Sequence, residues 1–445
     1  MSSAPRAPVL RESGGSGPAR RDCLDYLFRH ESGRMIAALT RVFGVHNLSL
    51  AEDVVQDALC RALEVWKLRG IPENPAAWLM TTAKNRAVDV LRRERRARAF
   101  APELERLLES EWTFIPTIEE ALGPQAIRDD ELRMMFSCVD PRLPEESQVA
   151  LILHILCGFS VGEIANAFLS SAAAIEKRIT RGKKVLSSSK RLFELSKSEH
   201  FQARLSAIQR ALYLLFNEGY HGSCTENLVR VELCREAMRL AALLTEHSLA
   251  ATPSTQALLA LMCLHTARLP TRVDESGLLS LLTDQDRSQW NSELIAQGHK
   301  LLELSANGEH LSEYHIEAAI AWCHVTAPSA QDTDWAQIVS LYDTLMAIRP
   351  SPVIALNRAI AIAQHEGPER GLAALRAIPD RERLGSYPFY PIALGEFELQ
   401  CGRHAAAREH FTAALPVARN SVEQKFIEQR IVACGNHQAS ASLTD

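Results

Sequence analysis

The feature that most constrains the fold is a run of helical signals that starts at Asn74 and ends in arginines near Arg98. Asn74 can cap a helix that has Pro75 at its first position, and a helix from there to Arg98 would measure about 35 Å. Between Arg86 and Arg98 six arginines stand against two acids. Long alternation of Val, Ile and Thr is scarce along the chain, so we expect an all-α protein.

One face of this predicted helix carries polar side chains. Steps of three and four residues place five of them on or beside that face: Asn85, Arg86, Asp89, Arg92 and Arg93. Arginines in such a row can neutralise phosphates and release counterions. An ordinary solvated helix end is also basic, so the row by itself leaves both interpretations open.

A second basic segment, Ser160–Ser187, has the pattern of a helix-turn-helix. Ser160-Val-Gly-Glu163 is a capping box that opens a short helix to Phe168, and a second helix is predicted from Ala172 to Ser187. An ordinary helical hairpin is the alternative. The outer stripe of the second helix carries four cations: Lys177, Arg178, Arg181 and Lys184. The run Ala172–Ala174 cannot make bidentate bonds to bases, which predicts weak or shape-based sequence readout.

An earlier helix is predicted from Ser49 to Trp66, opened by the capping box Ser49-Leu-Ala-Glu52. Its polar edge carries three acids and an amide: Glu52, Asp53, Gln56 and Asp57. Periodicity alone favours a solvated helix face for this row.

The chain of 445 residues is too long for a single core. We expect a disordered arm at 1–20, a helical unit at 21–98, an acidic linker at 99–130, a helix-turn-helix unit at 131–191 and a helical extension at 192–445. A linker of about 30 residues reaches at most ~100 Å, which allows DNA contacts two helical turns apart.

The predicted extension shows helix after helix. Leu394-Gly395, Gly402, Ala407, Phe411 and Ala414 have the small-and-large spacing of a tetratricopeptide unit, and such arrays bind peptides or partner helices. Lys and Arg number 28 against 25 Asp and Glu before residue 192, and 21 against 29 after it. An acidic extension can cover the basic helices within the molecule or bind another protein.

Other classes of function find little support. His154 and Cys157 share a helix face among apolar residues, which favours a buried turn over a metal site. Gly14-Gly15-Ser16-Gly17 lacks the lysine and the preceding strand of a phosphate loop. No apolar run approaches the roughly 20 residues of a membrane span, and scattered cysteines fit a reducing cytoplasm. We therefore expect a cytoplasmic protein that is no enzyme and needs no cofactor and no metal.

Three segments within about residues 21–191 resemble an extracytoplasmic-function sigma factor of the sigma-70 family. They are Ala51-Glu-Asp-Val-Val-Gln-Asp-Ala-Leu59, the stretch from Asn74-Pro-Ala-Ala-Trp78 to Arg93, and Phe159-Ser-Val-Gly-Glu-Ile-Ala-Asn-Ala-Phe168 with Ile175–Lys184. Leu215-Phe-Asn-Glu-Gly-Tyr220, Leu261-Met-Cys-Leu-His265 and Thr283-Asp-Gln-Asp-Arg-Ser-Gln-Trp290 are similar to a subgroup with a tetratricopeptide-like extension.

The resemblance implies a sigma factor that binds core RNA polymerase and directs promoter-specific initiation. It implies that Glu52, Asp53, Gln56 and Asp57 bind the β′ clamp, with the β flap as a second polymerase contact. It further implies that Asn85, Arg86, Asp89, Arg92 and Arg93 read and melt the −10 region, while Lys177, Arg178, Arg181 and Lys184 hold the −35 element. The alternative is a DNA-binding regulator that senses a ligand or partner through its repeats and needs a preassembled holoenzyme.

Overall fold

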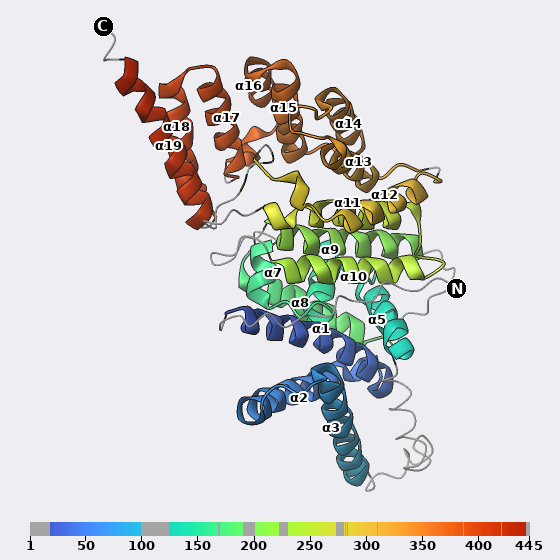
Figure 1. Cartoon of the computed structure of the whole chain (residues 1–445). Helices are drawn as coiled ribbons and strands as arrows, with labels where there is room; N and C mark the ends of the chain where they lie inside the picture. The colour runs from blue at the N-terminus through green and yellow to red at the C-terminus, as the bar shows by residue number, and fades with distance from the viewer. Residues whose placement is uncertain are drawn as a thin grey trace. The chain divides into compact units, whose positions relative to one another are not determined.

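The regular elements of the computed structural model are all helices within the residues that it describes, which agrees with the predicted all-α class (Figure 1). These residues are 18–98, 124–167, 170–189, 201–221, 230–272, 280, 282, 284–308, 310–385, 387–419 and 421–441. The chain divides into two compact units, residues 1–165 with 171–195 and residues 166–170 with 196–445. The predicted arm lies outside the described residues as far as position 17, and α1 begins at Pro18.

The first unit is arranged around its long N-terminal helix, α1, which packs against α2, α3 and α5. A short 3-10 turn, η1 (Val45–Asn47), links α1 to α2. The described helices of this unit are α1 (Pro18–Phe43), α2 (Leu48–Arg69), α3 (Pro75–Arg98), α5 (Pro124–Cys138), α6 (Glu145–Ile155), α7 (Val161–Ala167) and α8 (Ala172–Ser187). The pairs α1–α5 and α6–α8 supply much of the packing that joins them.

Helix α5 overlaps the end of the predicted acidic linker. It begins at Pro124 and so crosses the predicted boundary at residue 130. The side chain of Asp130 is fully buried on it, with the Arg41 guanidinium of α1 3.4 Å away. Asp130 is therefore part of the packed interior of the unit, where a buried carboxylate needs a positive partner beside it. The preceding part of the predicted linker, residues 99–123, lies outside the described residues.

Two glycines let α1 approach the end of α6 very closely. A Cβ atom on Gly33 would stand 2.1 Å from the carbonyl oxygen of Leu156, a separation that real atoms do not adopt. Gly158 has a φ of 65°, and its own Cβ would stand 3.2 Å from the Cα of Arg29. The close packing of α1 on this turn therefore requires residues without side chains at both positions.

The second unit is built from consecutive helices that pack on their neighbours, as Figure 1 shows for the stretch from α13 to α19. Its described helices are α9 (Phe201–His221), α10 (Val231–Glu246), α11 (Pro253–Thr266), α12 (Ser292–Ser305), α13 (Glu313–Thr326), α14 (Trp335–Ile348), α15 (Pro352–Glu366), α16 (Pro368–Arg376), α17 (Phe389–Gln400), α18 (His404–Ala414) and α19 (Ser421–Ala441).

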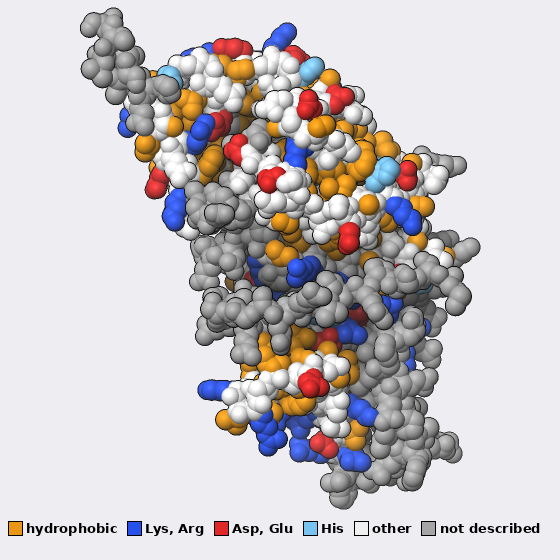
Figure 2. Space-filling model, viewed as in Figure 1, with side chains coloured by type: hydrophobic (Ala, Val, Ile, Leu, Met, Phe, Trp, Pro, Cys, Tyr) orange, Lys and Arg blue, Asp and Glu red, His pale blue; other side chains and the backbone are white. Residues whose placement is uncertain are grey.

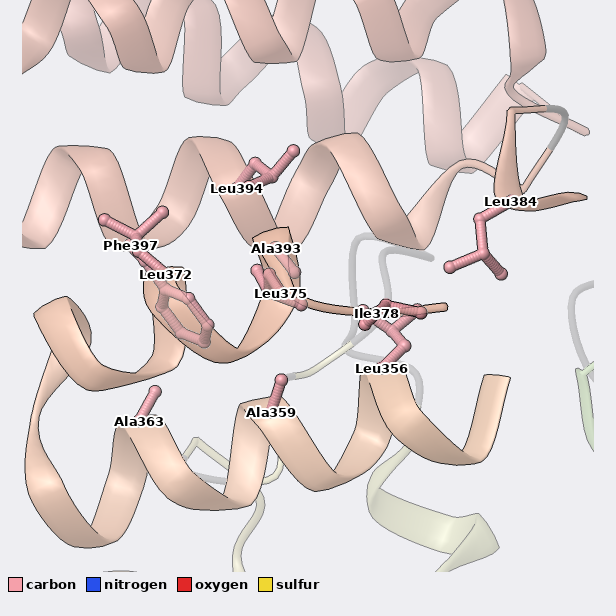
Figure 3. Close-up of a cluster of buried hydrophobic side chains, with 10 residues drawn as sticks. All are labelled: Leu356, Ala359, Ala363, Leu372, Leu375, Ile378, Leu384, Ala393, Leu394 and Phe397. Atoms are coloured by element: carbon pink, nitrogen blue, oxygen red, sulfur yellow. The ribbon is translucent and has the colours of Figure 1, made fainter. Parts of the chain in front are cut away.

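Helices α15, α16 and α17 share one apolar core, in which Phe397 of α17 lies near Leu372 of α16 and Ala363 of α15 (Figure 3). The next pair, α17 and α18, meets where Gly395 faces the ring of Phe411, with Ala407 fully buried beside it. Small residues facing large ones let neighbouring helices approach, which is the packing that the repeat spacing predicted. The tetratricopeptide assignment itself stays a prediction.

Candidate nucleic-acid interface

Helix α3 presents the first predicted basic face. The Ala77 N–H donates to Asn74 Oδ1 over 3.0 Å, so Asn74 caps the helix and Pro75 stands at its first position, as predicted. Leu79, Ala83 and Ala87 are fully buried on the inner side. The outer side carries four exposed members of the predicted set, Asn85, Asp89, Arg92 and Arg93, whereas Arg86 is partly buried. Figure 2 shows Lys and Arg side chains gathered over the α2 and α3 end of this unit.

An aromatic cluster fixes how α2 crosses α3. The ring centroids of Trp66 and Trp78 are 5.4 Å apart in an edge-on arrangement, and Phe28 of α1 lies 5.6 Å from Trp66. Edge-on aromatic pairs add specific attraction to the burial of their area. The cluster therefore holds the basic face of α3 and the acidic edge of α2 in a fixed mutual position.

The acidic edge of α2 lies beside the basic face of α3. The guanidinium of Arg86 donates to Asp57 Oδ2 at 2.7 Å, which joins one residue of each predicted set. Asp53, Gln56 and Asp57 are exposed, and Glu52 is partly buried. Because the Asp57–Arg86 pair is largely open to water, its main effect is to orient both side chains, with little gain in stability.

The start of α2 corrects one sequence prediction. The helix begins at Leu48 after the 3-10 turn η1, and the side chain of Asn47 at its cap accepts no hydrogen bond from the first turn. The predicted capping box Ser49–Glu52 is therefore wrong, because Ser49 already lies inside the first turn. The Glu52 carboxylate is instead bound by Lys183, as described below.

Helices α7 and α8 have the predicted helix-turn-helix order. The Ser160 N–H donates to Glu163 Oε2 at 2.9 Å and the Glu163 N–H donates to Ser160 Oγ at 3.2 Å, so this capping box is confirmed. Helix α8 has the predicted bounds, and the Ala174 N–H donates to the cap residue Ser171. The turn residues 168 and 169 lie outside the described residues.

The predicted DNA-binding side chains of α8 have different surroundings: three are exposed to solvent and one is paired with an acid of the same unit. Lys177, Arg181 and Lys184 are exposed on its outer side. Ile175, Ile179 and Leu186 are buried, and Gly182 leaves room for the side chain of Leu151 on α6. Arg178 reaches the Glu146 carboxylate at 2.6 Å, so this predicted DNA contact already has an acidic partner.

Two ion pairs join the helix-turn-helix to the first three helices. The Lys183 ammonium lies 2.7 Å from the Glu52 carboxylate and 3.2 Å from His154 Nε2. On the other side, the Arg29 guanidinium donates to Glu163 at 2.9 Å. The sequence analysis did not single out Lys183 or Arg29. Their partners lie more than 130 positions away along the chain, and no local pattern reports such a pairing.

These pairs control the protonation of their neighbours. Burial alone would raise the pKa of Glu163, but hydrogen bonds from Arg29 and Ser160 outweigh it and lower that pKa to about 2. The pKa of His154 is lowered, chiefly by burial and also by the charge of Lys183. Glu163 is therefore ionised and its attachment to Arg29 persists at neutral pH, while a neutral imidazole lies beside Lys183.

Three family models match the chain. Residues 27–97 match sigma-70 region 2, and residues 141–186 match sigma-70, region 4. The chain belongs to the sigma-70 family. Residues 204–306 match a family of unknown function, DUF6596. "Uncharacterized protein R00370" of Rhizobium meliloti (strain 1021) is 38% identical over 396 residues, which cover 89% of this chain and 92% of the relative.

The protein is thus a sigma factor of the extracytoplasmic-function type with a C-terminal extension. It directs transcription initiation by binding core RNA polymerase and promoter DNA, as its two sigma regions require. Region 2 contains α2, α3 and most of α1, and region 4 contains α6, α7 and α8. Both predicted basic faces and the acidic edge of α2 fall inside these matched segments.

Of the helices that the structure describes, none combines the length and the apolar character needed to cross a membrane. Over the same residues, no group of three or more His, Cys, Asp and Glu side chains is arranged to hold a metal ion. His154 contacts the Phe159 carbonyl through Nδ1, and Cys157 is buried nearby.

Proposed function

We propose that the acidic edge of α2 is the surface that docks on the β′ clamp of core polymerase. Its members are Glu52, Asp53, Gln56 and Asp57. Acids in a row on a rigid helix are complementary to a basic clamp surface, and such complementarity mainly sets encounter rate and register. The exposure of Asp53, Gln56 and Asp57 supports this role.

The face of α3 that carries Asn85, Arg86, Asp89, Arg92 and Arg93 would hold and help to melt the −10 region. Single-stranded bases bind where positive charge follows the backbone and where polar side chains can meet flipped bases. The exposure of Arg92 and Arg93 supports this assignment, since exposed guanidinium groups can reach phosphates.

Helix α8 would grip the duplex at the −35 element through Lys177, Arg178, Arg181 and Lys184, with the β flap as the polymerase contact of region 4. Ala172 and Ala173 are exposed at the start of the helix, where side chains normally read bases. Phosphate contacts and groove shape would therefore outweigh base-specific bonds.

The observation that carries the proposal is the pairing of Glu52 with Lys183. Glu52, which is a predicted polymerase contact, forms an ion pair with Lys183 of α8, the predicted DNA-binding helix of the same unit. Docking on polymerase would exchange this partner for a basic clamp residue. The exchange would remove one of the two ion pairs that join region 4 to region 2, and so would favour their separation on the promoter.

The test is transcription by sigma-free core polymerase supplemented with the purified protein. Initiation is expected at specific promoters, and the double variant Gln56→Ala with Asp57→Lys should bind core much more weakly. Glu64→Lys on the same helix is the matched control, because Glu64 is exposed outside the acidic edge and pairs with Arg61. Unchanged core binding by the double variant would contradict the clamp assignment. If the protein were active only with a preassembled holoenzyme, the result would favour the alternative function of a DNA-binding transcriptional regulator.

In this proposal the polymerase performs all of the chemistry, in the cytoplasm, and the C-terminal unit has a regulatory role. Its acidic balance suits either a cover for the basic helices or a protein-binding surface. Truncation after Arg191 separates the two ideas. Higher initiation by the truncated protein supports masking, whereas lost initiation supports a required partner contact.

A further inference from the structure

Arginines gather around one tryptophan in the second unit. The guanidinium carbons of Arg268 and Arg287 lie 5.4 Å and 4.8 Å from the centroid of the Trp290 ring. Arg272 stacks on Tyr220 at 3.9 Å. Arg268 follows α11 and is only 7% exposed, while Arg287 opens the 3-10 turn η4 (Arg287–Gln289).

Within the described residues, Arg268 and Arg287 donate hydrogen bonds to uncharged oxygens. Arg287 Nη1 donates to the carbonyls of His324 and Ala327, each at 2.6 Å, at the C-terminal end of α13. Arg268 donates through Nε and Nη2 to the amide oxygen of Gln285, both at 3.4 Å. The two side chains are thus fixed in position without neutralisation of their charge.

The framework around them is also fixed. The Trp290 indole N–H donates to Thr271 Oγ1 at 2.9 Å, and the Asn291 N–H donates to the Ala267 carbonyl at 2.9 Å. These bonds tie η4 to the segment that follows α11. Binding groups held by such a framework lose little freedom when a ligand arrives.

Positive charge exceeds negative charge at this position. Within the described part of the chain, no carboxylate forms an ion pair with Arg268 or Arg287, and Asp332 attracts Arg287 only from further away. The C-terminal ends of α11 and α13 supply about half a negative charge each, which offsets part of the excess. Elsewhere in the unit arginines do have a carboxylate partner, since the exposed Arg376 and Arg403 both bind the buried carboxylate of Glu398.

Two nitrogen atoms of this cluster lack a hydrogen-bond partner within the described residues. Arg287 Nη2 and His324 Nδ1 are buried and make no hydrogen bond within the described residues. Burial lowers the pKa of Arg268, as do the charges of Arg272 and Arg287. The pKa of His324 falls to about 3, first through burial and then through the charges of Arg268 and Arg287. An anion would relieve every one of these unfavourable interactions.

We propose that Arg268, Arg287 and His324 bind a compact, multiply charged oxyanion of the phosphate class at the junction of α11, η4 and α13. Guanidinium groups match phosphate oxygens through paired N–H donors. The indole face of Trp290 is already engaged by guanidinium groups, so it is not free to stack on a nucleobase. This favours inorganic phosphate or a small phosphomonoester over a nucleotide.

The test measures thermal unfolding and binding of the full-length protein with inorganic phosphate as the probe, at constant ionic strength against chloride. Phosphate should raise the unfolding midpoint in a saturable way. Arg268→Gln and Arg287→Gln should each raise the Kd for phosphate at least tenfold. Arg370→Gln is the matched control, because Arg370 is exposed in the same unit beside Glu366, and its Kd should not change.

A second measurement needs no variant. Phosphate should shift the imidazole resonances of His324 and raise the pKa of that ring, since an anion replaces repulsion by attraction. Glycerol 3-phosphate distinguishes a phosphomonoester ligand, which binds more tightly than inorganic phosphate, from the free ion. No saturable response to either phosphate, or an equal response to succinate, would overturn the proposal.

Discussion

Each unit contains a glutamate with a strongly shifted pKa, and the two shifts, at Glu163 and Glu317, are in opposite directions. Glu163, in the first unit, has Arg29 fixed beside it and its pKa falls to about 2. Glu317, on α13 in the second unit, accepts a hydrogen bond from Tyr213, but burial prevails and raises its pKa to about 7. The first unit keeps its charges in ion pairs that a partner can exchange, whereas the second keeps some of them uncompensated.

The largest expected effect concerns the exposed arginines of the first unit. Arg92→Ala with Arg93→Ala should slow promoter opening by about tenfold or more, since each lost phosphate contact removes roughly 1 kcal/mol or more. The slope of log affinity against log salt should fall by about two. Transcription from duplex and pre-melted templates measures the defect. Full rescue on the pre-melted template would place the defect in opening, and an unchanged rate on duplex DNA would refute the assignment.

The next largest effect is expected at Glu163, the glutamate that is paired with Arg29. Glu163→Gln should lower the free energy of unfolding by about 2 kcal/mol at pH 7, because it removes a charge-assisted bond to Arg29. The lowered pKa of Glu163 means that this stability is present above pH 4.5 and is lost as pH falls toward 2. Denaturant melts from pH 7 to pH 3 should therefore show a smaller acid dependence in the variant. An identical dependence would show that the pair is not formed in solution.

Glu317 should behave in the opposite sense. Its raised pKa means that the folded state holds a proton that the unfolded state releases, so stability falls as pH rises from about 4.5 to about 7. Glu317→Gln should then stabilise the protein by about 1 kcal/mol at pH 8 and should change little at pH 4.5. Thermal melts at the two pH values measure this. A loss of stability at pH 8 would mean that ionised Glu317 is well compensated.

The smallest effect concerns the pair that joins the two sigma regions. A double-mutant cycle of Glu52→Gln and Lys183→Met should give a coupling energy below about 1 kcal/mol, because the pair is partly open to water. Lys183→Met alone should nevertheless raise the affinity for core polymerase several-fold by releasing Glu52. A lower affinity would indicate that Lys183 itself contacts the polymerase.

Local signals predicted the local structure well. The cap at Asn74, the capping box of Ser160 and Glu163 and the bounds of α8 all follow from residues within one helical turn. The box at Ser49 failed because a preceding 3-10 turn leads straight into α2. No pattern of neighbouring residues distinguished Ser49 from Ser160.

Contacts between distant residues set the limit of the sequence analysis. The sequence analysis did not predict that α5 packs on α1, because an acidic stretch gives no sign of such packing. The segment Thr283–Trp290 was recognised as a motif from the sequence. The sequence did not show that its Arg287 lies near Arg268 and His324, which is the arrangement that suggests a binding site. The residue sets for clamp, −10 and −35 contacts stay predictions until binding is measured.

Regions 2 and 4 are also held together by close packing at Gly33, which is possible because glycine has no side chain. Salt cannot screen this packing. Raising ionic strength would weaken the bonds of Lys183 and Arg29, yet the backbone of α1 would still fit against the end of α6. A single added methyl group there would act as a wedge between the regions while every charge stayed unchanged. Separation of the two sigma regions is thus open to control by shape as well as by electrostatics.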